Sequence, residues 1–343
     1  MIKLLSIITI HVLSVVVMLT CNAFDLNSQY SYVKQVELRN NPYQYVYDIY
    51  RRNTALDARF VSNDTGYIPL TYNMKQNMMW NHHSVCTNKT FVLLMYFTCQ
   101  HELERRNLIR HYVKQNMIID GMIVNYVMIV AAGANETSAL NELKKENEEF
   151  NDLLVSLHED NYRNWPITVL DAYMWVRDYC LQASYAVKVD GDAWVHLGNL
   201  IHYLRDAPKE RFYGGIARRE FFRGGQEYKG IQVFPHDFPG QWITFNLGIC
   251  TVLSRDVIPY VNIGVQFMDY IWPGCEDILI AEVLRKGGIY RFGRPKGYHW
   301  MLFHIRVNGT SIPENTISVH TSRDYQRLID FYKTHSTNYT ILD

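Results

Sequence analysis

The pattern of hydrophobic and polar positions predicts strands that alternate with helices from residue 90 onward. Residues 91–97 form a continuous apolar run, which is typical of a strand buried on both faces. Apolar residues at helical spacing then predict a helix over residues 101–115. Further strands are predicted at residues 124–131, 152–156 and 184–189, and further helices at residues 138–149 and 167–181, with Pro166 in the first turn of the last helix. The alternation predicts an α/β fold whose mostly parallel sheet is covered on both sides and binds ligands beyond the carboxyl ends of its strands.

The first part of the chain predicts a secretory or anchoring segment followed by a stem. Residues 4–19 are uncharged and follow Lys3, and two interpretations stay open. A signal peptide over residues 1–23 would be cut after Ala23, whereas an uncleaved signal-anchor would leave the rest of the chain in the lumen. Residues 24–89 are polar and rich in Tyr and Asn, so we interpret them as a stem or lead-in. The main domain is then expected over residues 90–343.

Two further features favour exposure to an oxidising lumen. N-glycosylation sequons begin at Asn63, Asn88, Asn135, Asn308 and Asn338. Beyond Cys21 the chain has five cysteines, and no two of them have the CxxC spacing of a zinc or thioredoxin site. Two disulfides and one unpaired thiol are therefore expected, with the pairing left open.

Composition and charge narrow the classes of function. Hydrophobic residues make up 48% of the 343 residues, which is enough for a large core. Lys plus Arg and Asp plus Glu each number 34, so the chain lacks the basic excess of a typical nucleic-acid binder. No GxGxxG follows the first strand and no GxxxxGK[ST] occurs anywhere, so neither a dinucleotide-binding turn nor a P-loop is supported.

An acidic doublet follows the fourth predicted strand. The run Asp190-Gly191-Asp192 contains Asp-Gly between apolar residues, and a two-residue hairpin turn is one interpretation. At the carboxyl end of a parallel strand, however, two carboxylates at this spacing suit Mn²⁺ or Mg²⁺, which prefer oxygen ligands and keep positions open for phosphate oxygens. A cation held there would neutralise charge on a departing diphosphate.

Several motifs, in order, resemble those of the β-1,3-glycosyltransferase family, which includes β-1,3-galactosyltransferases and β-1,3-N-acetylglucosaminyltransferases, with Fringe as a distant relative. Residues 188–195 resemble the family's K-x-D-D-D-x-F-V, residues 276–278 its E-D-V, and residues 318–321 its V-H-S. Weaker matches lie at residues 104–110, Glu146, residues 150–154, residues 159–165, Trp175 and Cys180. The resemblance implies a GT-A type fold with a single Rossmann-like domain, a UDP-sugar donor, Mn²⁺ and inversion at the anomeric carbon.

The resemblance also implies roles for particular side chains. Asp192 would bind the metal, with Asp190 near the ribose or a metal-bound water, and His320 would be the second protein ligand, for which His299 competes. Asp277, beside Glu276, would be the catalytic base that takes the proton of the acceptor hydroxyl. A helix acid favoured by the helix dipole is the alternative interpretation of this pair. Cys275 is expected to anchor the adjacent loop by a disulfide.

A second group of residues is expected near the nucleotide or the acceptor. Arg105, Arg106 and Arg110 follow the first strand, where uridine diphosphate would bind, although solvated charges paired with Glu102 are the alternative. Lys188 would lie near the diphosphate or serve as a packing stem. Trp242 and Phe245 would stack on an acceptor sugar or pack in the core.

Departures from the family pattern indicate a divergent member. Gly191 replaces the middle Asp of the triple, Ala281 replaces a Gly after E-D-V, and Tyr112-Val113 replaces T-W. Residues 166–170 lack the Lys of the family's L-T-x-K-T, and residues 245–248 hold fewer glycines than its acceptor-side loop. These differences bear most on the choice of donor sugar and acceptor.

The sequence therefore predicts a metal-dependent inverting hexosyltransferase that moves galactose or an N-acetylhexosamine from UDP to a glycan acceptor on protein or lipid, in β-1,3 linkage. The expected location is the Golgi membrane, as a single-pass type II protein with a lumenal catalytic domain, or the ER lumen or outside the cell if the chain is cut after Ala23. A catalytically inactive lumenal binding protein or chaperone is the alternative, and no nucleic-acid partner is expected.

Overall fold

A computed structural model describes residues 43–56, 68–69, 78–80, 82, 84–268, 270–290, 302–303, 310–322 and 324–335. The chain divides into the units Met1–Ile49 and Tyr50–Asp343, and the second unit contains the sheet and the site described below. Within the described ranges no helix is long and apolar enough to cross a bilayer. The predicted anchor segment lies outside these ranges.

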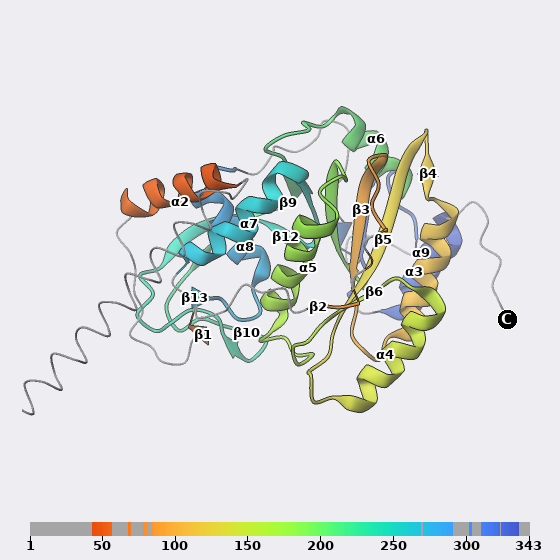
Figure 1. Ribbon diagram of the computed structural model, residues 1–343, viewed down its shortest axis with the longest axis horizontal. Helices are drawn as coiled ribbons and strands as arrows, with labels where there is room; N and C mark the ends of the chain where they lie inside the picture. The colour runs from red at the N-terminus through yellow and green to blue at the C-terminus, as the bar shows by residue number, and fades with distance from the viewer. Residues whose placement is uncertain are drawn as a thin grey trace, which may run out of the picture. The chain divides into compact units, whose positions relative to one another are not determined.

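An eight-stranded sheet forms the centre of the second unit (Figure 1). Its path runs β2-β6-β5-β3-β7-β12-β9, with β4 paired to β5. The strands are β2 (Met78–Met79), β3 (Thr90–Phe97), β4 (Ile118–Ile119), β5 (Met122–Ala131), β6 (Leu153–Ser156), β7 (Tyr185–Asp190), β9 (Tyr213–Phe222) and β12 (Gln241–Ser254). Strands β6, β5, β3 and β7 are parallel, and β2, β4, β9 and β12 join antiparallel. The predicted α/β fold with a mostly parallel centre is confirmed.

Helices cover both faces of this sheet (Figure 1). The helices are α2 (Gln44–Leu56), α3 (Leu103–Gln115), α4 (Thr137–Phe150), α5 (Trp165–Tyr179), α6 (Leu197–Asp206), α7 (Ile258–Gly264), α8 (Glu276–Lys286) and α9 (Tyr325–His335), with 3-10 turns at Arg255–Val257 and Val265–Phe267. Helices α5, α7 and α8 pack together on one side, and α3 packs with α9 on the other. Pro166 stands in the first turn of α5, as predicted.

The apolar run of β3 is explained by burial on both faces. Val92, Leu94 and Tyr96 belong to a core cluster with residues of α3, α6 and α9. The alternate residues Leu93 and Met95 are also fully buried. A strand in this position has no solvent-facing side, so its sequence shows no polar alternation.

Short strands form three smaller sheets. Strand β8 (Ala193–Val195) pairs with β15 (Ser318–His320), which pairs with β14 (Leu302–Phe303). Strand β10 (Glu227–Tyr228) pairs with β11 (Ile231–Gln232), and β1 (Ile68–Pro69) pairs with β13 (Tyr270–Ile271). Since β8 pairs with β15 and not with β7, the hairpin interpretation of Asp190-Gly191-Asp192 is wrong.

Part of the predicted stem belongs to the folded unit. Strand β2 adds an edge to the central sheet, pairing Met78 with Ser156, and β1 pairs with β13. The Tyr50 hydroxyl donates to the carbonyl of Tyr260 at 3.0 Å and to that of Val283 at 2.8 Å. The boundary predicted at residue 89 is therefore too late in the chain, because strands of two residues carry no detectable pattern.

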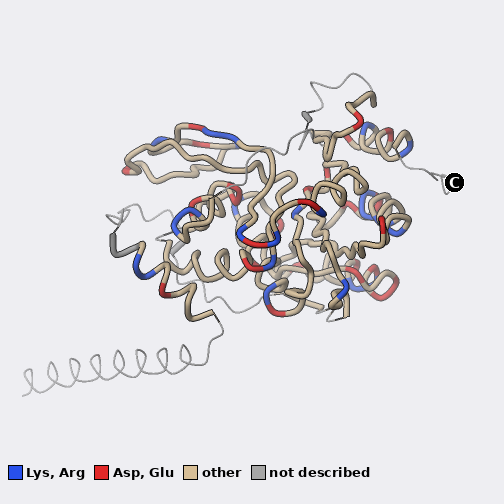
Figure 2. The backbone as a smooth tube through the Cα atoms, turned by 90° about the horizontal axis from the view of Figure 1, so that it is seen from above, with Lys and Arg blue, Asp and Glu red and all other residues tan. Residues whose placement is uncertain are grey.

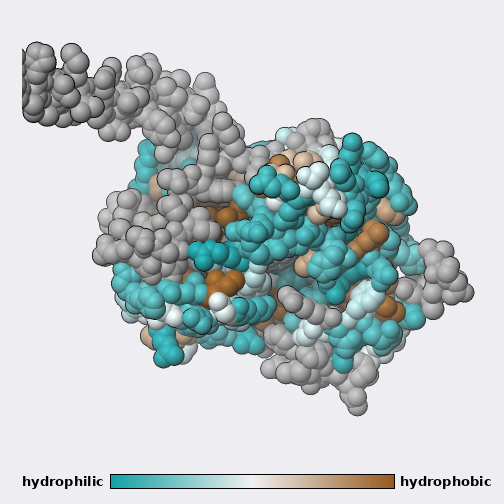
Figure 3. All heavy atoms as spheres, turned by 90° about the horizontal axis from the view of Figure 1, so that it is seen from below, coloured by the Kyte–Doolittle hydropathy of each residue, from teal (hydrophilic) through white to brown (hydrophobic). Residues whose placement is uncertain are grey.

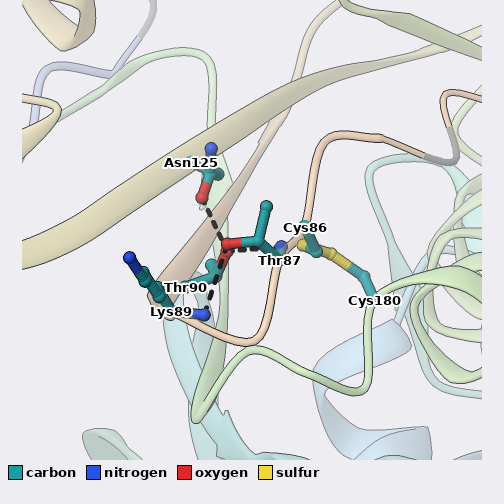
Figure 4. The surroundings of a disulfide bond; sticks show 6 residues. All are labelled: Cys86, Thr87, Lys89, Thr90, Asn125 and Cys180. Atoms are coloured by element: carbon teal, nitrogen blue, oxygen red, sulfur yellow. Dashed lines mark hydrogen bonds between the residues drawn. A yellow bond between two sulfur atoms is a disulfide. The ribbon is translucent and has the colours of Figure 1, made fainter.

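One disulfide joins Cys86, just before β3, to Cys180 at the end of α5 (Figure 4). Beside it, Thr90 donates a hydrogen bond to Asn125 of β5, which ties the start of β3 to its neighbour (Figure 4). Cys99, Cys250 and Cys275 are not disulfide-bonded. The expected second disulfide and the anchoring role of Cys275 are therefore wrong, since both Cys250 and Cys275 are buried thiols.

Surface charge and hydropathy fit the neutral composition. Basic and acidic residues are interspersed along the described backbone in Figure 2, which shows no stretch dominated by one sign. The described atoms on the face shown in Figure 3 are mostly hydrophilic, with hydrophobic atoms in small separate groups.

Candidate active site

A cavity of about 650 Å³ opens where β3 and β7 end. Its walls come from seven parts of the fold, namely the end of β3, the start of α3, the segment before α5, the end of β7 with the loop that follows it, the β9–β12 ribbon, the start of α8 and the end of β15. It brings together most of the predicted site residues: Arg105, Asp190, Asp192, Glu276, Asp277 and His320. Ligand binding beyond the carboxyl ends of parallel strands is thus possible where the sequence placed it.

Asp192 and His320 form the candidate metal site. His320 Nε2 lies 3.3 Å from Asp192 Oδ2. The pair is held in place because Thr321 donates from its backbone N–H, at 2.8 Å, and from its hydroxyl, at 2.7 Å, to the Asp192 carbonyl. A carboxylate oxygen suits Mn²⁺, and an imidazole nitrogen is a common ligand of divalent metals.

The donor set fits a cation that shares its coordination with a substrate. Among the residues that the structure describes, no group of three or more His, Cys, Asp or Glu side chains is arranged to hold a metal ion. Asp192 and His320 would supply two ligands, leaving further positions for phosphate oxygens and water. His299, the competing ligand, lies outside the described residues.

The Asp190 carboxylate contacts Lys188 and not the Asp192–His320 pair. Its Oδ1 accepts from Lys188 Nζ at 2.6 Å. Burial raises the pKa of Asp190 to about 6, although the Lys188 ammonium acts in the opposite direction. Asp190 lines the cavity, whereas Lys188 is fully buried behind it.

Asp277 is the half-buried acid of the cavity. It stands in the first turn of α8, where its Oδ1 accepts from the Ile278 backbone N–H at 2.8 Å. Burial and then the neighbouring Glu276 carboxylate raise the pKa of Asp277 to about 8. A carboxyl group with such a pKa is a suitable proton acceptor near neutral pH.

Gly191 fits a space that excludes a side chain. A Cβ atom at this position would lie 2.8 Å from Thr98 Cγ2 and 2.9 Å from the Phe97 carbonyl oxygen. The backbone N–H of Gly191 donates to the same Phe97 carbonyl at 2.8 Å. Gly191 stands where the family has the middle Asp of its triple, and the close contact between this loop and the end of β3 leaves no room there for a side chain.

Arg106 and Arg110 do not line the cavity, which corrects their predicted role. Arg106 makes a two-pronged ion pair with Glu146, at 2.8 and 2.7 Å, and also donates to the Cys99 carbonyl. Arg110 pairs in the same way with Asp152, with both contacts at 2.8 Å. Both guanidinium groups are buried, and their ion pairs with Glu146 and Asp152 connect α3 to α4 and to the start of β6. Arg105 alone of the three reaches the cavity, where it pairs with Glu102.

Trp242 and Phe245 lie on opposite faces of β12. Phe245 lines the cavity and is buried against Phe222, with ring centroids 5.9 Å apart. Trp242 is 61% exposed, does not line the cavity, and packs against Phe221 of β9. Stacking of Trp242 on a sugar inside the cavity is therefore not supported.

Sequence reasoning missed a cluster at the mouth of the cavity. Lys229 Nζ lies 4.1 Å from the ring centre of Tyr162 and 5.2 Å from that of Tyr228. Lys229 and Gly230 both have positive φ, at 51° and 75°, and form the turn between β10 and β11. The Tyr-Lys-Gly sequence was the available signal, since such turns favour glycine. 

Two of the predicted glycosylation sites can be placed. Asn88 and Asn135 are exposed, as an acceptor for glycosylation must be. Asn63, Asn308 and Asn338 lie outside the described residues.

Comparison with known proteins assigns the chain to a family. Residues 104–293 match the galactosyltransferase family, a segment that includes most of the cavity walls, and the chain belongs to this family. Beta-1,3-galactosyltransferase 1 of Mus musculus is 25% identical over 226 residues, which are 63% of this chain and 66% of that protein. Lactosylceramide 1,3-N-acetyl-beta-D-glucosaminyltransferase of Xenopus tropicalis is 29% identical over 225 residues, which are 61% of this chain and 58% of that protein.

Solved structures add little to this assignment. The galactosyltransferase LgtC, in complex with donor and acceptor sugar analogues, superposes with a TM-score of 0.35 and 9% identity over 72% of this chain and 97% of that one. A similarity at this level supports no inference about function. The family match and the parallel centre of the sheet agree with the α/β glycosyltransferase fold that the sequence predicts.

Proposed function

We propose that the protein is a metal-dependent, inverting glycosyltransferase that transfers a hexose or N-acetylhexosamine from a UDP-sugar to a glycan, in β-1,3 linkage. One observation carries the proposal: a single cavity contains both the Asp192–His320 pair and the half-buried acid Asp277. Transfer with inversion needs both functions, one to support the leaving diphosphate and one to accept a proton.

Asp277 would remove the proton from the acceptor hydroxyl. The acceptor oxygen then forms a bond to the anomeric carbon while the bond from that carbon to the diphosphate oxygen breaks, and UDP departs. A divalent cation, bound by Asp192 and His320, would offset the negative charge of the leaving diphosphate. Arg105, the one arginine of the predicted three that lines the cavity, would contact the nucleotide.

The names of the relatives suggest the classes of donor and acceptor. One is named a galactosyltransferase and another an N-acetylglucosaminyltransferase acting on lactosylceramide. We therefore propose UDP-galactose or a UDP-N-acetylhexosamine as donor, and a glycan on protein or lipid as acceptor. Because Gly191 and Ala281 depart from the family pattern, the donor sugar and the acceptor are to be identified by the donor screen described next.

A donor screen tests the proposal. Purified protein is incubated with a panel of UDP-sugars and Mn²⁺, with and without simple glycosides, and UDP release is measured. We expect release with one donor class, stimulation by an acceptor, and loss of activity with a chelator. Binding of UDP without turnover would instead support the alternative of an inactive, glycosyltransferase-like binding protein.

We also propose that the catalytic domain lies in the lumen of the Golgi, held by an N-terminal anchor, with the ER lumen or secretion as the alternative if the chain is cut after Ala23. The exposed sequons at Asn88 and Asn135 support this. Endoglycosidase treatment of the protein from cells should increase its mobility, and N88Q and N135Q should each remove one glycan. Amino-terminal sequencing separates the two arrangements.

A further inference from the structure

Lys188 is a fully buried cation behind the wall of the cavity, with a relative exposure of 1%. Its Nζ donates to Asp190 Oδ1 at 2.6 Å and to the Gly248 carbonyl at 2.6 Å, and it lies 3.2 Å from Glu276 Oε1. Asp190 is the last residue of β7, the strand that also carries Lys188, whereas Gly248 lies in β12 and Glu276 in the first turn of α8. One ammonium group thus connects the end of its own strand to two other walls of the candidate active site.

Two aromatic rings complete the surroundings of this ammonium. Lys188 Nζ lies 5.2 Å from the ring centre of Phe97, at the end of β3, and 5.6 Å from that of Trp165, at the start of α5. Both rings line the cavity. The stem of Lys188 is therefore enclosed by elements that all end at the active site, and its charge is directed toward the acids.

Gly248 allows β12 to approach this cluster closely. A Cβ atom at Gly248 would lie 2.2 Å from Glu276 Oε1 and 3.4 Å from Lys188 Nζ. The glycine therefore lets its own carbonyl accept from Lys188 while Glu276 remains against the ammonium.

We infer that Lys188 is a positioning residue, which fixes the end of β7 and the first turn of α8 relative to each other and so places Asp277 for proton transfer. This inference rests on the proposed function, because it assigns Asp277 the role of base. Lys188 does not line the cavity and so does not itself contact a substrate bound there. Its effect would pass through Asp190 and through Glu276, the residue next to the base.

Electrostatics support this geometry. Glu276 raises the pKa of Asp277 and Lys188 lowers it, so the lysine limits the mutual repulsion of neighbouring carboxylates. Burial alone would lower the pKa of Lys188, but Asp190 and Glu276 outweigh burial and raise it above the ordinary value. The ammonium therefore stays charged throughout the working pH range.

The test compares Lys188→Met with Lys209→Met. Lys209 is an exposed lysine that serves as the control because its Nζ also lies over two rings, 4.8 Å from Phe91 and 5.1 Å from Tyr185, but it does not line the cavity and bonds backbone carbonyls. For each variant, kcat and the donor KM are measured by UDP release, the Kd of UDP with Mn²⁺ by calorimetry, and folding by circular dichroism. We expect Lys188→Met to lower kcat by about 100-fold, as misplacement of a general base does, with KM and Kd changed less than about threefold. Lys209→Met should resemble the wild type.

A third variant keeps the test decisive if Lys188→Met does not fold. Removing the cation alone leaves two carboxylates without it, whereas Lys188→Met combined with Glu276→Gln removes one charge of each sign. We expect this double variant to fold, to bind UDP with Mn²⁺ and still to show the low kcat. If the wild type is active and Lys188→Met, or the folded double variant, has a normal kcat, the inference about Lys188 is overturned and the proposed function is not. An inactive wild type would overturn the proposed function and the inference together.

Discussion

His320 Nε2 and Asp192 Oδ2 lie 3.3 Å apart because two distant segments meet in a small sheet. His320 ends β15, and Ala193, the residue after Asp192, lies opposite it in β8. The contact therefore depends on strand pairing, not on the loop alone. We infer that this pairing holds the two proposed metal ligands at a fixed separation before any ligand arrives.

Removing the Asp192 carboxylate should abolish metal-dependent binding of the nucleotide. We expect Asp192→Ala to weaken the affinity for UDP in the presence of Mn²⁺ by at least about tenfold, since a ligating carboxylate is lost. Calorimetric titrations with and without Mn²⁺ measure this effect. Asp178→Asn, at an exposed position near the end of α5, is the control. Unchanged affinity in Asp192→Ala would refute the metal role.

Replacing the base should stop transfer and leave the nucleotide site intact. Asp277→Asn keeps the size of the side chain but cannot take a proton, so we expect kcat to fall by about 10²–10⁴-fold. The Kd of UDP with Mn²⁺ should stay within about threefold of wild type. Near-normal turnover in this variant would show that another group acts as base.

The raised pKa of Asp277 predicts how activity and stability depend on pH. The base must be ionised, so kcat/KM should rise with pH, reach half of its maximum near the pKa of about 8 and level off above it. The folded state binds this proton more tightly than the unfolded chain, whose Asp pKa is about 3.9. The free energy of unfolding is therefore expected to decrease as pH rises between these two values.

Thermal melts of wild type and Asp277→Asn across this range check the stability effect. The variant lacks the buried charge, so its Tm should exceed that of wild type at pH 8 and approach it at about pH 4, near the unfolded pKa. A Tm difference independent of pH would contradict the linkage. A pH–rate profile already level at pH 6 would contradict the raised pKa.

Elements whose hydrophobic pattern lies within one segment could be predicted from the sequence, whereas contacts between residues far apart in the chain could not. Strands β3, β5, β6 and β7 and the helices between them were predicted because burial gives a hydrophobic pattern within each segment, whereas the two-residue strand β4 was not predicted. The ion pairs of Arg106 and Arg110 were missed because their partners Glu146 and Asp152 lie in other elements, and one sequence does not reveal such pairing. The motif spacing also predicted candidate roles for Asp192 and Asp277. The contacts of Lys188 with Gly248 and Glu276 could not be predicted, because they form only in the assembled fold.

Substitution of two neighbouring arginines should affect different properties, namely the stability of the protein for Arg106 and its affinity for UDP for Arg105. Arg106→Met leaves the buried Glu146 carboxylate with Arg110 as its ion-pair partner and without the two hydrogen bonds from Arg106, so we expect the free energy of unfolding to fall by about 1–3 kcal/mol. Arg105→Met removes a cation from the cavity wall and should weaken UDP binding, with a small effect on stability because its partner Glu102 retains access to water. Urea unfolding and calorimetry on both variants separate the two effects. If Arg106→Met were stable and weakened UDP binding selectively, the nucleotide role first expected for Arg106 would be restored.

Restoring the family's middle acid should damage this protein. Gly191→Asp places a Cβ atom within 3 Å of both Thr98 Cγ2 and the Phe97 carbonyl, and the carbonyl belongs to the end of a central strand that does not yield easily. We expect the free energy of unfolding to fall by about 1–3 kcal/mol, as in overpacked sites, without tighter binding of Mn²⁺. Gly191→Ala separates size from charge, since it adds the same Cβ and no carboxylate. Urea unfolding should give similar losses for both variants. A Gly191→Asp protein of wild-type stability would mean that the β7–β8 loop shifts readily away from β3, and that the glycine is not required by this packing.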